Sequence, residues 1–352
     1  MKILELNFEN GWRGGERQTF YSMCHFRDRG ADVTLIARKN EPLAKLAKAA
    51  GFQVIECTSG FAAALKLAQV GRQFDIVQTQ TASALTWAVL MRPLYRRPLV
   101  ATRRVAFPIT KRKTLLKYRA AQHVTAVSAA AAAPIIEDGT PVTVIPSAVQ
   151  LPQPDPRRID AFKTAHGLHG KHIVGTSAAL KWDKDPLMLV AAVERLTTPN
   201  TVLVHFGRGE MAEEVAQEIK KRGLQDRYLL AGFEPEVEQF YAMMDVFVMS
   251  SIEEGLGSSV LDAYLARIPV ASTNAGGLRE ALADGRGLAS PVSDPAALAR
   301  NIDCLLSDKP EDRARRDRQI ETAHAWVEQR CSIATMGDAY MAIFNRLRSP
   351  KG

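Results

Sequence analysis

The sequence predicts an α/β protein made of two doubly wound domains, and three observations support this fold class. Short β-branched runs alternate with helical stretches, which is typical of parallel strands joined by crossover helices. The alternation stops in the proline-rich stretch 146–156 and then restarts. The chain has 352 residues, of which 46% are hydrophobic and 24% charged. That composition is typical of a globular protein, and the length suits about two domains.

The first domain is expected over residues 1–150, as a Rossmann-like parallel sheet. It opens with a strand at 2–6, a loop at 11–15 and a helix at 16–29 that Gly30 ends. The further strands are expected at 33–37, 53–57, 75–79, 99–102, 124–127 and 142–145. A last helix, at about 333–348 within the terminal segment 333–352, is expected to return to this domain.

A second Rossmann-like domain is expected over 151–332, after the proline-rich linker. Its strands are expected at 172–176, 202–206, 228–231, 246–249 and 269–272, with helices such as 186–196 and 211–222 between them. Ligands bind outside the carboxyl ends of the strands in such sheets. Two facing domains of this kind therefore predict a ligand-binding cleft.

The charge balance favours anionic partners. The chain has 46 Lys and Arg against 38 Asp and Glu, a net charge of +8. The net charge alone does not distinguish among three possible anionic partners: nucleotides, acidic membrane surfaces and nucleic acid. The most basic segment, 92–117, lies in the first domain and suggests a phosphorylated acceptor or the anionic face of a membrane, with a solvated charged face as an equal alternative.

Cysteine usage and hydropathy indicate a cytoplasmic protein. The four cysteines stand alone, without a C-x-x-C pair, so neither a zinc site nor a disulfide framework is indicated. Glu5 and Glu9 interrupt the apolar stretch at the N-terminus, and no run reaches the ~18 apolar residues of a membrane span. We expect neither a signal peptide nor an integral membrane segment. Peripheral contact with the inner face of the cytoplasmic membrane stays open.

The first glycine loop follows the first strand and opens a helix. Amides at Gly14 and Gly15, at the positive end of that helix, could meet a phosphate or a sugar. The alternative is a structural tight turn. The loop lacks the G-x-G-x-x-G order, and no acidic residue ends the second strand, so a nicotinamide cofactor is disfavoured.

A more specific motif is the run 250–263, with the sequence SSIEEGLGSSVLDA, directly after the strand 246–249. Gly255 and Gly257 let a ligand approach the chain closely. Gly257, Ser258 and Ser259 lie where a helix would start, and they would present unpaired amides to a diphosphate.

Charged residues complete this predicted site. Glu254 lies in the loop, and Asp262 falls one to two turns into the helix, where a carboxylate suits the hydroxyls of a ribose or hexose. Lys184, in the loop after the strand 172–176, could neutralise a phosphate; the alternative is a solvated loop lysine. Asp185 is expected to be an N-cap rather than a metal ligand, because Pro186 follows it, and we expect no essential metal.

With these residues the chain resembles the retaining glycosyltransferases of the GT-B fold known as glycosyltransferase family 4. The resemblance runs from Met1 to about Ala342 and is strongest over 232–288. Its segments there are Gly232-Phe233, 241–250, the pair Glu254 and Asp262, 266–270 and 274–280. Weaker matches are Gly14-Gly15, 124–128 and 144–149.

The resemblance implies a role for each matched residue. Glu254 would contact the hydroxyls of the donor sugar, Asp262 would contact the nucleotide ribose, and Lys184 would neutralise the diphosphate. The other donor-binding residues that it implies are Gly14, Gly15, Phe233, Gly255, Leu256, Gly257, Ser258 and Ser259. Among them, the backbone near Phe233 would face the nucleobase.

The chain also departs from the family pattern. The departures are Asp262 for a usual Glu, Ala178 for a usual Arg, and Gln78 and Gln80 for histidines. Arg103 and Arg104 stand near the position where a histidine often contacts the donor sugar. Because a guanidinium can bind two phosphate oxygens, we hypothesise that one of them supplies the charge of the missing arginine. The alternative is that they bind an anionic acceptor or pair with a surface carboxylate.

Together with these residues, the resemblance implies a metal-independent retaining enzyme of the hexosyltransferase type, with Glu254, Lys184, Arg103 and Arg104 as its catalytic residues. It would move a sugar from a nucleotide-diphosphate donor, with UDP favoured, to a glycan or glycolipid in lipopolysaccharide or envelope polysaccharide assembly. Nucleic acid is not an expected partner. Two alternatives stay open: a GT-B sugar-nucleotide epimerase, and a non-catalytic nucleotide-sugar binding protein.

Overall fold

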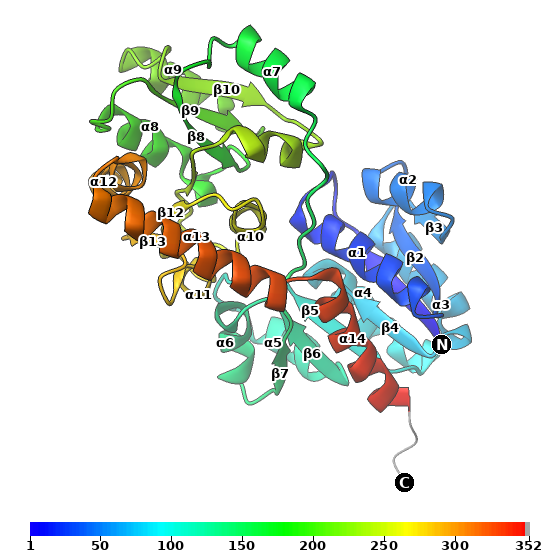
Figure 1. The fold of residues 1–352 in the computed structure, drawn as a ribbon. Coiled ribbons are helices and arrows are strands. Elements are labelled where there is room, and N and C mark those ends of the chain that lie inside the picture. The colour runs from blue at the N-terminus through cyan, green and yellow to red at the C-terminus, as the bar shows by residue number, and fades with distance from the viewer. Residues whose placement is uncertain (349–352) are drawn as a thin grey trace. The chain divides into compact units, whose positions relative to one another are not determined.

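The computed structural model describes residues 1–348 and contains two compact units. Unit 1 comprises Met1–Ala148 and the chain from Arg330 onward, and unit 2 comprises Val149–Gln329. Each unit contains one sheet with helices packed on it (Figure 1). None of the helices in residues 1–348 combines the length and apolar character that crossing a bilayer requires.

The sheet of unit 1 has seven parallel strands in the order β3-β2-β1-β4-β5-β6-β7. They are β1 Lys2–Asn7, β2 Asp32–Arg38, β3 Gln53–Cys57, β4 Ile76–Thr79, β5 Leu99–Arg103, β6 His123–Ala126 and β7 Val142–Val144. The strand order reverses between β1 and β4. In an open α/β sheet, this switch point is where ligands bind, outside the carboxyl ends of the strands.

Helices cover both faces of this sheet. They are α1 Gly14–Asp28, α2 Pro42–Ala49, α3 Gly60–Val70, α4 Ala82–Tyr95, α5 Arg112–Arg119, α6 Ala129–Ile136 and α14 Ile333–Arg348, with a 3₁₀ turn η1 Gly71–Gln73. Side chains alternate along β1, so that Ile3 packs in a cluster with α1 and α14, whereas Leu4 and Leu6 pack in a cluster with α3 and α4. Strands buried on both faces read as nearly continuous apolar runs.

The sheet of unit 2 has six parallel strands in the order β10-β9-β8-β11-β12-β13. They are β8 His172–Ser177, β9 Thr201–Phe206, β10 Tyr228–Gly232, β11 Val246–Met249, β12 Val270–Thr273 and β13 Leu288–Ser290. Its switch point lies between β8 and β11. The helical elements are α7 Pro156–Ala165, η2 Trp182–Lys184, α8 Pro186–Glu194, α9 Ala212–Lys221, η3 Val237–Met243, α10 Ser258–Leu265, α11 Leu278–Leu282, α12 Pro295–Leu306 and α13 Pro310–Arg330.

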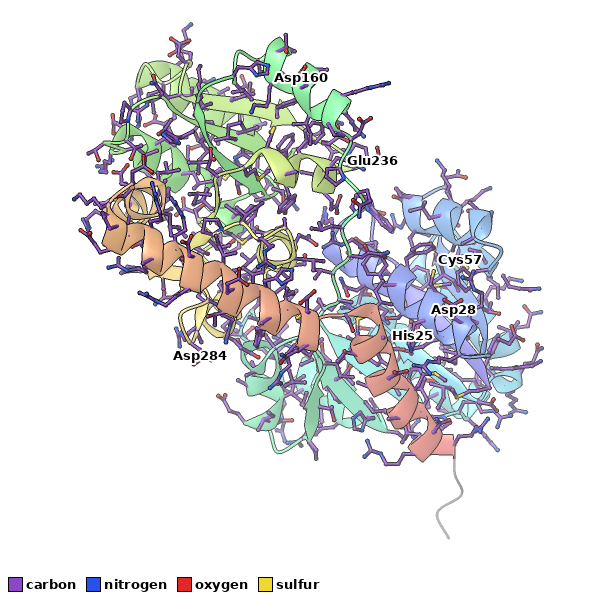
Figure 2. All side chains as sticks on the ribbon, viewed as in Figure 1. His25, Asp28, Cys57, Asp160, Glu236 and Asp284 are labelled. Carbon is purple, nitrogen blue, oxygen red and sulfur yellow. The ribbon has the colours of Figure 1, made fainter. Side chains whose placement is uncertain are left out.

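The last helix packs on the first unit, as the sequence predicted. The Phe26 ring of α1 lies with its centroid 5.3 Å from Phe344 and 6.2 Å from Tyr340 of α14. His25 Nε2 is 2.8 Å from Asp338 Oδ1, and α1 carries His25 toward α14 (Figure 2). The part of the predicted segment 333–352 that follows residue 348 lies outside the described residues.

Most of the predicted elements are present, with boundaries shifted by one or two residues. The first helix begins at Gly14, so that Gly14 and Gly15 of the predicted loop belong to its first turn. One strand, β13, was missed. Its sequence is Leu-Ala-Ser, three residues without a β-branched side chain, and it joins the sheet through its pairing with β12.

Candidate functional site

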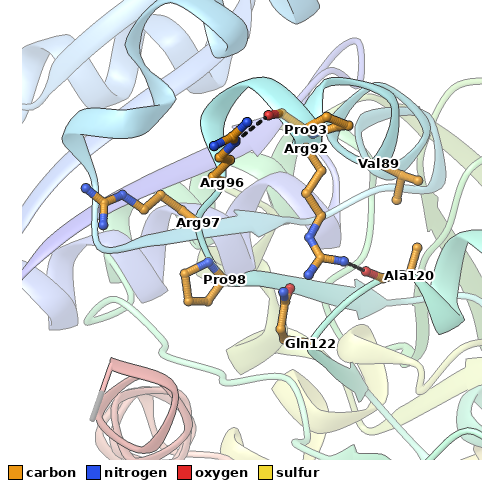
Figure 3. A pocket seen from close by; sticks show the side chains of 8 residues that line it. All are labelled: Val89, Arg92, Pro93, Arg96, Arg97, Pro98, Ala120 and Gln122. Carbon is orange, nitrogen blue, oxygen red and sulfur yellow. Dashed lines mark hydrogen bonds between the residues drawn. The ribbon is translucent and has the colours of Figure 1, made fainter. Parts of the chain in front are cut away.

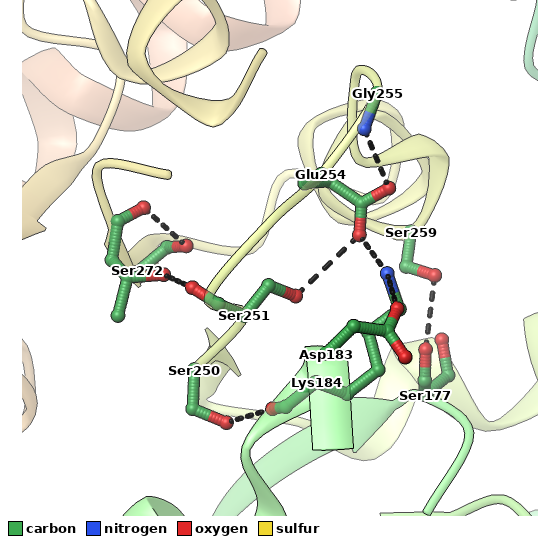
Figure 4. A network of polar contacts seen from close by, with 10 residues as sticks. Ser177, Asp183, Lys184, Ser250, Ser251, Glu254, Gly255, Ser259 and Ser272 are labelled. Carbon is green, nitrogen blue, oxygen red and sulfur yellow. Dashed lines mark hydrogen bonds and ion pairs between the residues drawn. The ribbon is translucent and has the colours of Figure 1, made fainter. Parts of the chain in front are cut away.

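The candidate site of unit 2 is built from the loops that follow β8 and β11, at the switch point of the sheet. The first loop carries η2, and the second is the stretch 250–257. Hydrogen bonds join them. Ile252 N donates to Asp183 O at 2.9 Å, and Ser250 Oγ donates to Lys184 O at 2.7 Å (Figure 4). These bonds hold the two loops against each other.

Lys184 and Glu254 form the charged centre of this site. Lys184 Nζ is 2.5 Å from Glu254 Oε2 and 3.4 Å from Asp183 Oδ2. The two side chains of the closer pair are 20% and 17% exposed. Burial by itself would lower the pKa of Lys184, but the carboxylates of Glu254 and Asp183 outweigh it and raise that pKa above its ordinary value. Lys184 is thus a fixed cation rather than a freely solvated loop lysine.

The glycines around Glu254 allow the loop to be packed tightly. Glu254 Oε1 accepts from Gly255 N at 3.2 Å, and the carbonyl of Glu254 accepts from Gly277 N at 2.8 Å. A Cβ at Gly277 would lie 2.1 Å from the carbonyl oxygen of Gly255, so only glycine fits there. These contacts hold the Glu254 carboxylate beside Lys184 (Figure 4).

The start of α10 presents free amides next to this pair. Gly257 is the N-cap, with φ at +80°, and the first helical bond runs from Val260 N to Gly257 O at 2.9 Å. Within residues 1–348, the amides of Leu256, Gly257, Ser258 and Ser259 donate to no acceptor. A helix N-terminus with unpaired amides attracts an anion.

A cluster of hydroxyls connects the end of β8 to α10, and the sequence analysis did not identify it. Ser177 Oγ lies 2.9 Å from Tyr241 Oη, and Ser259 Oγ donates to Ser177 O at 3.0 Å. Tyr241 Oη also donates to Ser259 O at 3.2 Å. The hydroxyl of Ser259 is therefore engaged with the protein, whereas its amide is not.

The other predicted residues of unit 2 lie on neighbouring elements. Asp262 is buried in the second turn of α10. Phe233 follows β10, is 43% exposed, and has the Arg208 guanidinium 5.6 Å from its ring centroid.

Arg208 is a candidate that the sequence reasoning missed. It lies between Gly207 and Gly209 directly after β9, and a glycine pair at the carboxyl end of a strand could have indicated it. Each glycine is tightly packed, because a Cβ at Gly207 would lie 1.9 Å from Ala178 O. The backbone of Arg208 is therefore packed against residues 178–180, and Leu180 N donates to Arg208 O at 3.1 Å.

The two arginines of unit 1 have different surroundings. Arg103 is buried, donates to the carbonyl of Phe107 and lies 6.0 Å from the ring centroid of Tyr118. Arg104 donates from Nε and Nη2 to Gln80 Oε1, at 3.2 and 2.6 Å. A Cβ at Gly15 would lie 3.7 Å from Arg104 Cδ, so Arg104 lies against the first turn of α1.

A shallow depression of about 600 Å³ lies elsewhere in unit 1 (Figure 3). It is lined by Val89, Arg92, Pro93, Arg96, Arg97, Pro98, Ala120 and Gln122. Pro98 and Gln122 immediately precede β5 and β6, so the depression is at the amino ends of these strands, opposite the switch-point edge. Its arginines donate to backbone carbonyls, as Arg96 Nε does to Pro93 O at 3.0 Å, and no carboxylate lines it.

Comparison with protein families accounts for nearly the whole chain. Residues 12–152 match the family described as Glycosyltransferase Family 4, and residues 159–326 match the one described as Glycosyl transferases group 1. The chain belongs to the family 4 glycosyltransferases. The resemblance inferred from the motifs is thereby confirmed.

Known relatives of this family 4 glycosyltransferase share about a third of their residues with it over part of their length. The lipopolysaccharide core biosynthesis glycosyltransferase LpsE of Rhizobium meliloti is 31% identical over 156 residues, 44% of each chain. The putative glycosyltransferase EpsD of Bacillus subtilis is 32% identical over 168 residues, 47% of this chain and 44% of EpsD. These alignments span less than half of either relative.

Solved structures have the same fold over the whole chain. Anabaena HepE in complex with UDP-glucose aligns with a TM-score of 0.87 and 22% identity, covering 98% of this chain and 100% of HepE. A glycosyltransferase from Rickettsia africae aligns with a TM-score of 0.86 and 19% identity, covering 99% of both chains. The fold of this family 4 glycosyltransferase is the GT-B α/β fold, as predicted.

Proposed function

We propose that this protein is a retaining glycosyltransferase that moves a sugar from a UDP-sugar to a glycan or glycolipid acceptor, without an essential metal. The observation that carries the proposal is the Lys184–Glu254 pair, 2.5 Å apart, beside the free amides that begin α10. A cation and a row of amides suit a diphosphate, and a carboxylate in the same place suits sugar hydroxyls. The HepE complexes with UDP-glucose and with UDP and glucose favour uridine among the nucleotides.

This site would promote the reaction by stabilising the leaving diphosphate. The bond between the anomeric carbon and the phosphate oxygen breaks, and the acceptor oxygen forms the new bond on the same face of the sugar. The acceptor hydroxyl gives its proton to the departing phosphate oxygen, so no protein base is needed. Lys184 and the amides of residues 256–259 would stabilise the negative charge that develops, the effect that often dominates catalysis.

The remaining donor contacts follow from the same placement. Glu254 would accept hydrogen bonds from the sugar, and Asp262 would accept them from the ribose. Phe233 and Arg208 would lie beside the nucleobase. Arg208 follows β9, the neighbour of β8, and Phe233 follows β10, the next strand along, both at the carboxyl edge of the sheet.

We assign the acceptor to unit 1 and propose a role in lipopolysaccharide or envelope polysaccharide assembly. The names of LpsE and of the lipopolysaccharide core mannosyltransferase LpcC of Rhizobium leguminosarum support this role. Unit 1 would also contact an anionic membrane surface: Leu90 and Leu94 are exposed one helical turn apart on α4, next to Arg96 and Arg97.

Cosedimentation with vesicles tests the membrane contact. Phosphatidylglycerol vesicles should bind the protein in low salt and phosphatidylcholine vesicles should not. Arg96→Glu with Arg97→Glu should abolish binding, whereas Arg313→Glu with Arg315→Glu on α13 should preserve it. Equal binding by both double variants would exclude α4 as the contact.

A thermal-shift panel of UDP, GDP, ADP and CMP, with and without their sugars, tests the donor. A ligand at a hundred times its Kd stabilises the folded state by about 2.7 kcal/mol. UDP and a UDP-sugar should raise the Tm, and the other nucleotides should raise it less. If no nucleotide raises the Tm, the transferase proposal fails.

A further inference from the structure

Unit 1 holds a buried carboxyl group that the proposed donor site does not use. Glu5 lies in the middle of β1 and is fully buried. It lies on the same face of the strand as Ile3, which packs with α1. Burial of a carboxyl group without a compensating partner is costly, so its surroundings indicate what it does.

Glu5 is connected to Arg104 through one side chain. Gln80 Nε2 donates to Glu5 Oε2 at 3.0 Å, and Gln80 Oε1 accepts from both Nε and Nη2 of Arg104. Gln80 follows β4, Arg104 follows β5, and β4 pairs with both β1 and β5. The chain of hydrogen bonds therefore crosses three adjacent strands at the switch point of the sheet.

The Gln80 amide can satisfy both partners in a single orientation. A guanidinium donates and never accepts, so the carbonyl oxygen of the amide must face Arg104. The NH₂ group then faces Glu5, where a carboxyl oxygen accepts from it. Glu5 thus accepts from the NH₂ group and helps to hold Gln80 in the orientation that Arg104 requires.

Arg104 is held without being neutralised. Among residues 1–348, no carboxylate is paired with it, and its Nη1 has no hydrogen-bond partner. Its Cδ lies against the position of Gly15 in the first turn of α1. Arg103, the neighbouring arginine, is instead engaged by Phe107 and Tyr118.

We propose that Glu5 and Gln80 are positioning residues that hold the Arg104 guanidinium at the start of α1, where it binds a phosphoryl group of a substrate. This inference rests on the proposed function, because the phosphoryl group belongs to a substrate. It also selects between the two arginines: Arg104 binds the anion, and Arg103 packs the loop that follows β5.

The test is NMR of the full chain labelled with ¹⁵N-arginine, with inorganic pyrophosphate as the probe. Arg104→Lys identifies the Nε–H resonance of Arg104. In the unaltered protein this proton should exchange slowly with water, and pyrophosphate should shift it in a saturable way. A resonance that pyrophosphate does not shift would refute anion binding by Arg104.

Four variants separate positioning from packing. Gln80→Leu and Glu5→Leu should each speed exchange of that proton and weaken pyrophosphate binding at least fivefold, whereas Glu5→Gln, which keeps the acceptor oxygen, should restore both. Gln78→Leu is the matched control, because Gln78 is a buried glutamine on β4 that donates to Thr102. If the exchange rate of the Arg104 Nε proton and the affinity for pyrophosphate are unchanged in Gln80→Leu or Glu5→Leu, the proposal is overturned.

The same samples separate this inference from the proposed function. A UDP thermal shift is measured in the unaltered protein and in each variant. Absence of that shift in the unaltered protein would reject the donor site. If UDP raises the Tm but the Arg104 resonance is the same in the Glu5 and Gln80 variants as in the unaltered protein, only the positioning role is rejected.

Discussion

Both units carry a cationic side chain at the carboxyl edge of a parallel sheet, but the groups that hold the two cations differ. In unit 2 the Lys184 ammonium is paired directly with Glu254 at 2.5 Å. In unit 1 the buried Glu5 meets Arg104 only through Gln80. Burial raises the pKa of Glu5 to about 8, against the lowering effects of Gln80 and Arg104, so Glu5 is uncharged at neutral pH.

This difference shows two ways of holding a cationic side chain in position for an anionic ligand. Lys184 shares its charge with carboxylates that hold it in place, and free amides nearby add positive potential. Arg104 is held by a neutral amide, so its whole charge stays available. A carboxylate paired directly with Arg104 would compete with a phosphoryl group for the same donors.

The largest expected effect comes from removing the cation of unit 2. Lys184→Met leaves Glu254 and Asp183 without their ammonium and leaves the diphosphate without its charge partner. Turnover of the accepted nucleotide sugar should fall about 10²–10³-fold, the usual cost of losing one stabilising donor. Steady-state kinetics measure this loss.

The control for that variant is Lys181→Met, in the same loop. Lys181 has no side-chain partner among the described residues, so its removal should change turnover less than twofold. If turnover falls equally in Lys184→Met and Lys181→Met, the loss comes from disturbing the loop and not from removing the Lys184 charge.

The second effect is the pH dependence of stability in unit 1. Because the folded-state pKa of Glu5 is raised to about 8, the folded protein keeps a proton that the unfolded chain releases above its ordinary pKa of 4.5. Stability therefore falls between about pH 5 and 8. Glu5→Gln removes this loss and should raise the free energy of unfolding at pH 8.5 by about 2–4 kcal/mol more than at pH 5.

Urea unfolding at both pH values, monitored by tryptophan fluorescence, measures the difference. Glu9→Gln, at an exposed position near β1, is the control and should show none. A gain that is the same at pH 5 and pH 8.5 would show that Glu5 is charged in the folded protein, and the contrast between the two units would disappear.

A smaller effect is expected from Gly257, the N-cap of α10. Its φ is +80°, and a Cβ there would lie 2.5 Å from Leu278 Cδ2. Gly257→Ala should therefore destabilise unit 2 by about 1–3 kcal/mol and weaken nucleotide binding by displacing the amides. Gly223→Ala is the matched control, because Gly223 also has positive φ, at +67°, with nothing within 4 Å. Equal nucleotide affinities in the two variants would show that the α10 amides do not bind the nucleotide.

Local sequence patterns were enough to predict both parallel sheets and the last helix itself, because these depend on hydrophobic periodicity and turn residues. The proximity of Lys184 and Glu254 could also be anticipated, since both follow strands whose carboxyl ends meet. The Glu5 network could not. In the sequence, Glu5 only interrupts an apolar run, and its partner Gln80 lies 75 residues away. Burial of a strand on both faces and pairing across the sheet are properties of the folded chain.

The most direct test of the account is calorimetric titration of UDP into the unaltered protein, Lys184→Met and Lys181→Met. We predict saturable binding to the unaltered protein, the same affinity in Lys181→Met, and at least a tenfold weaker affinity in Lys184→Met. An equal affinity in all three proteins, or no binding to any of them, would contradict the claim that the loops after β8 and β11 form a nucleotide-diphosphate site.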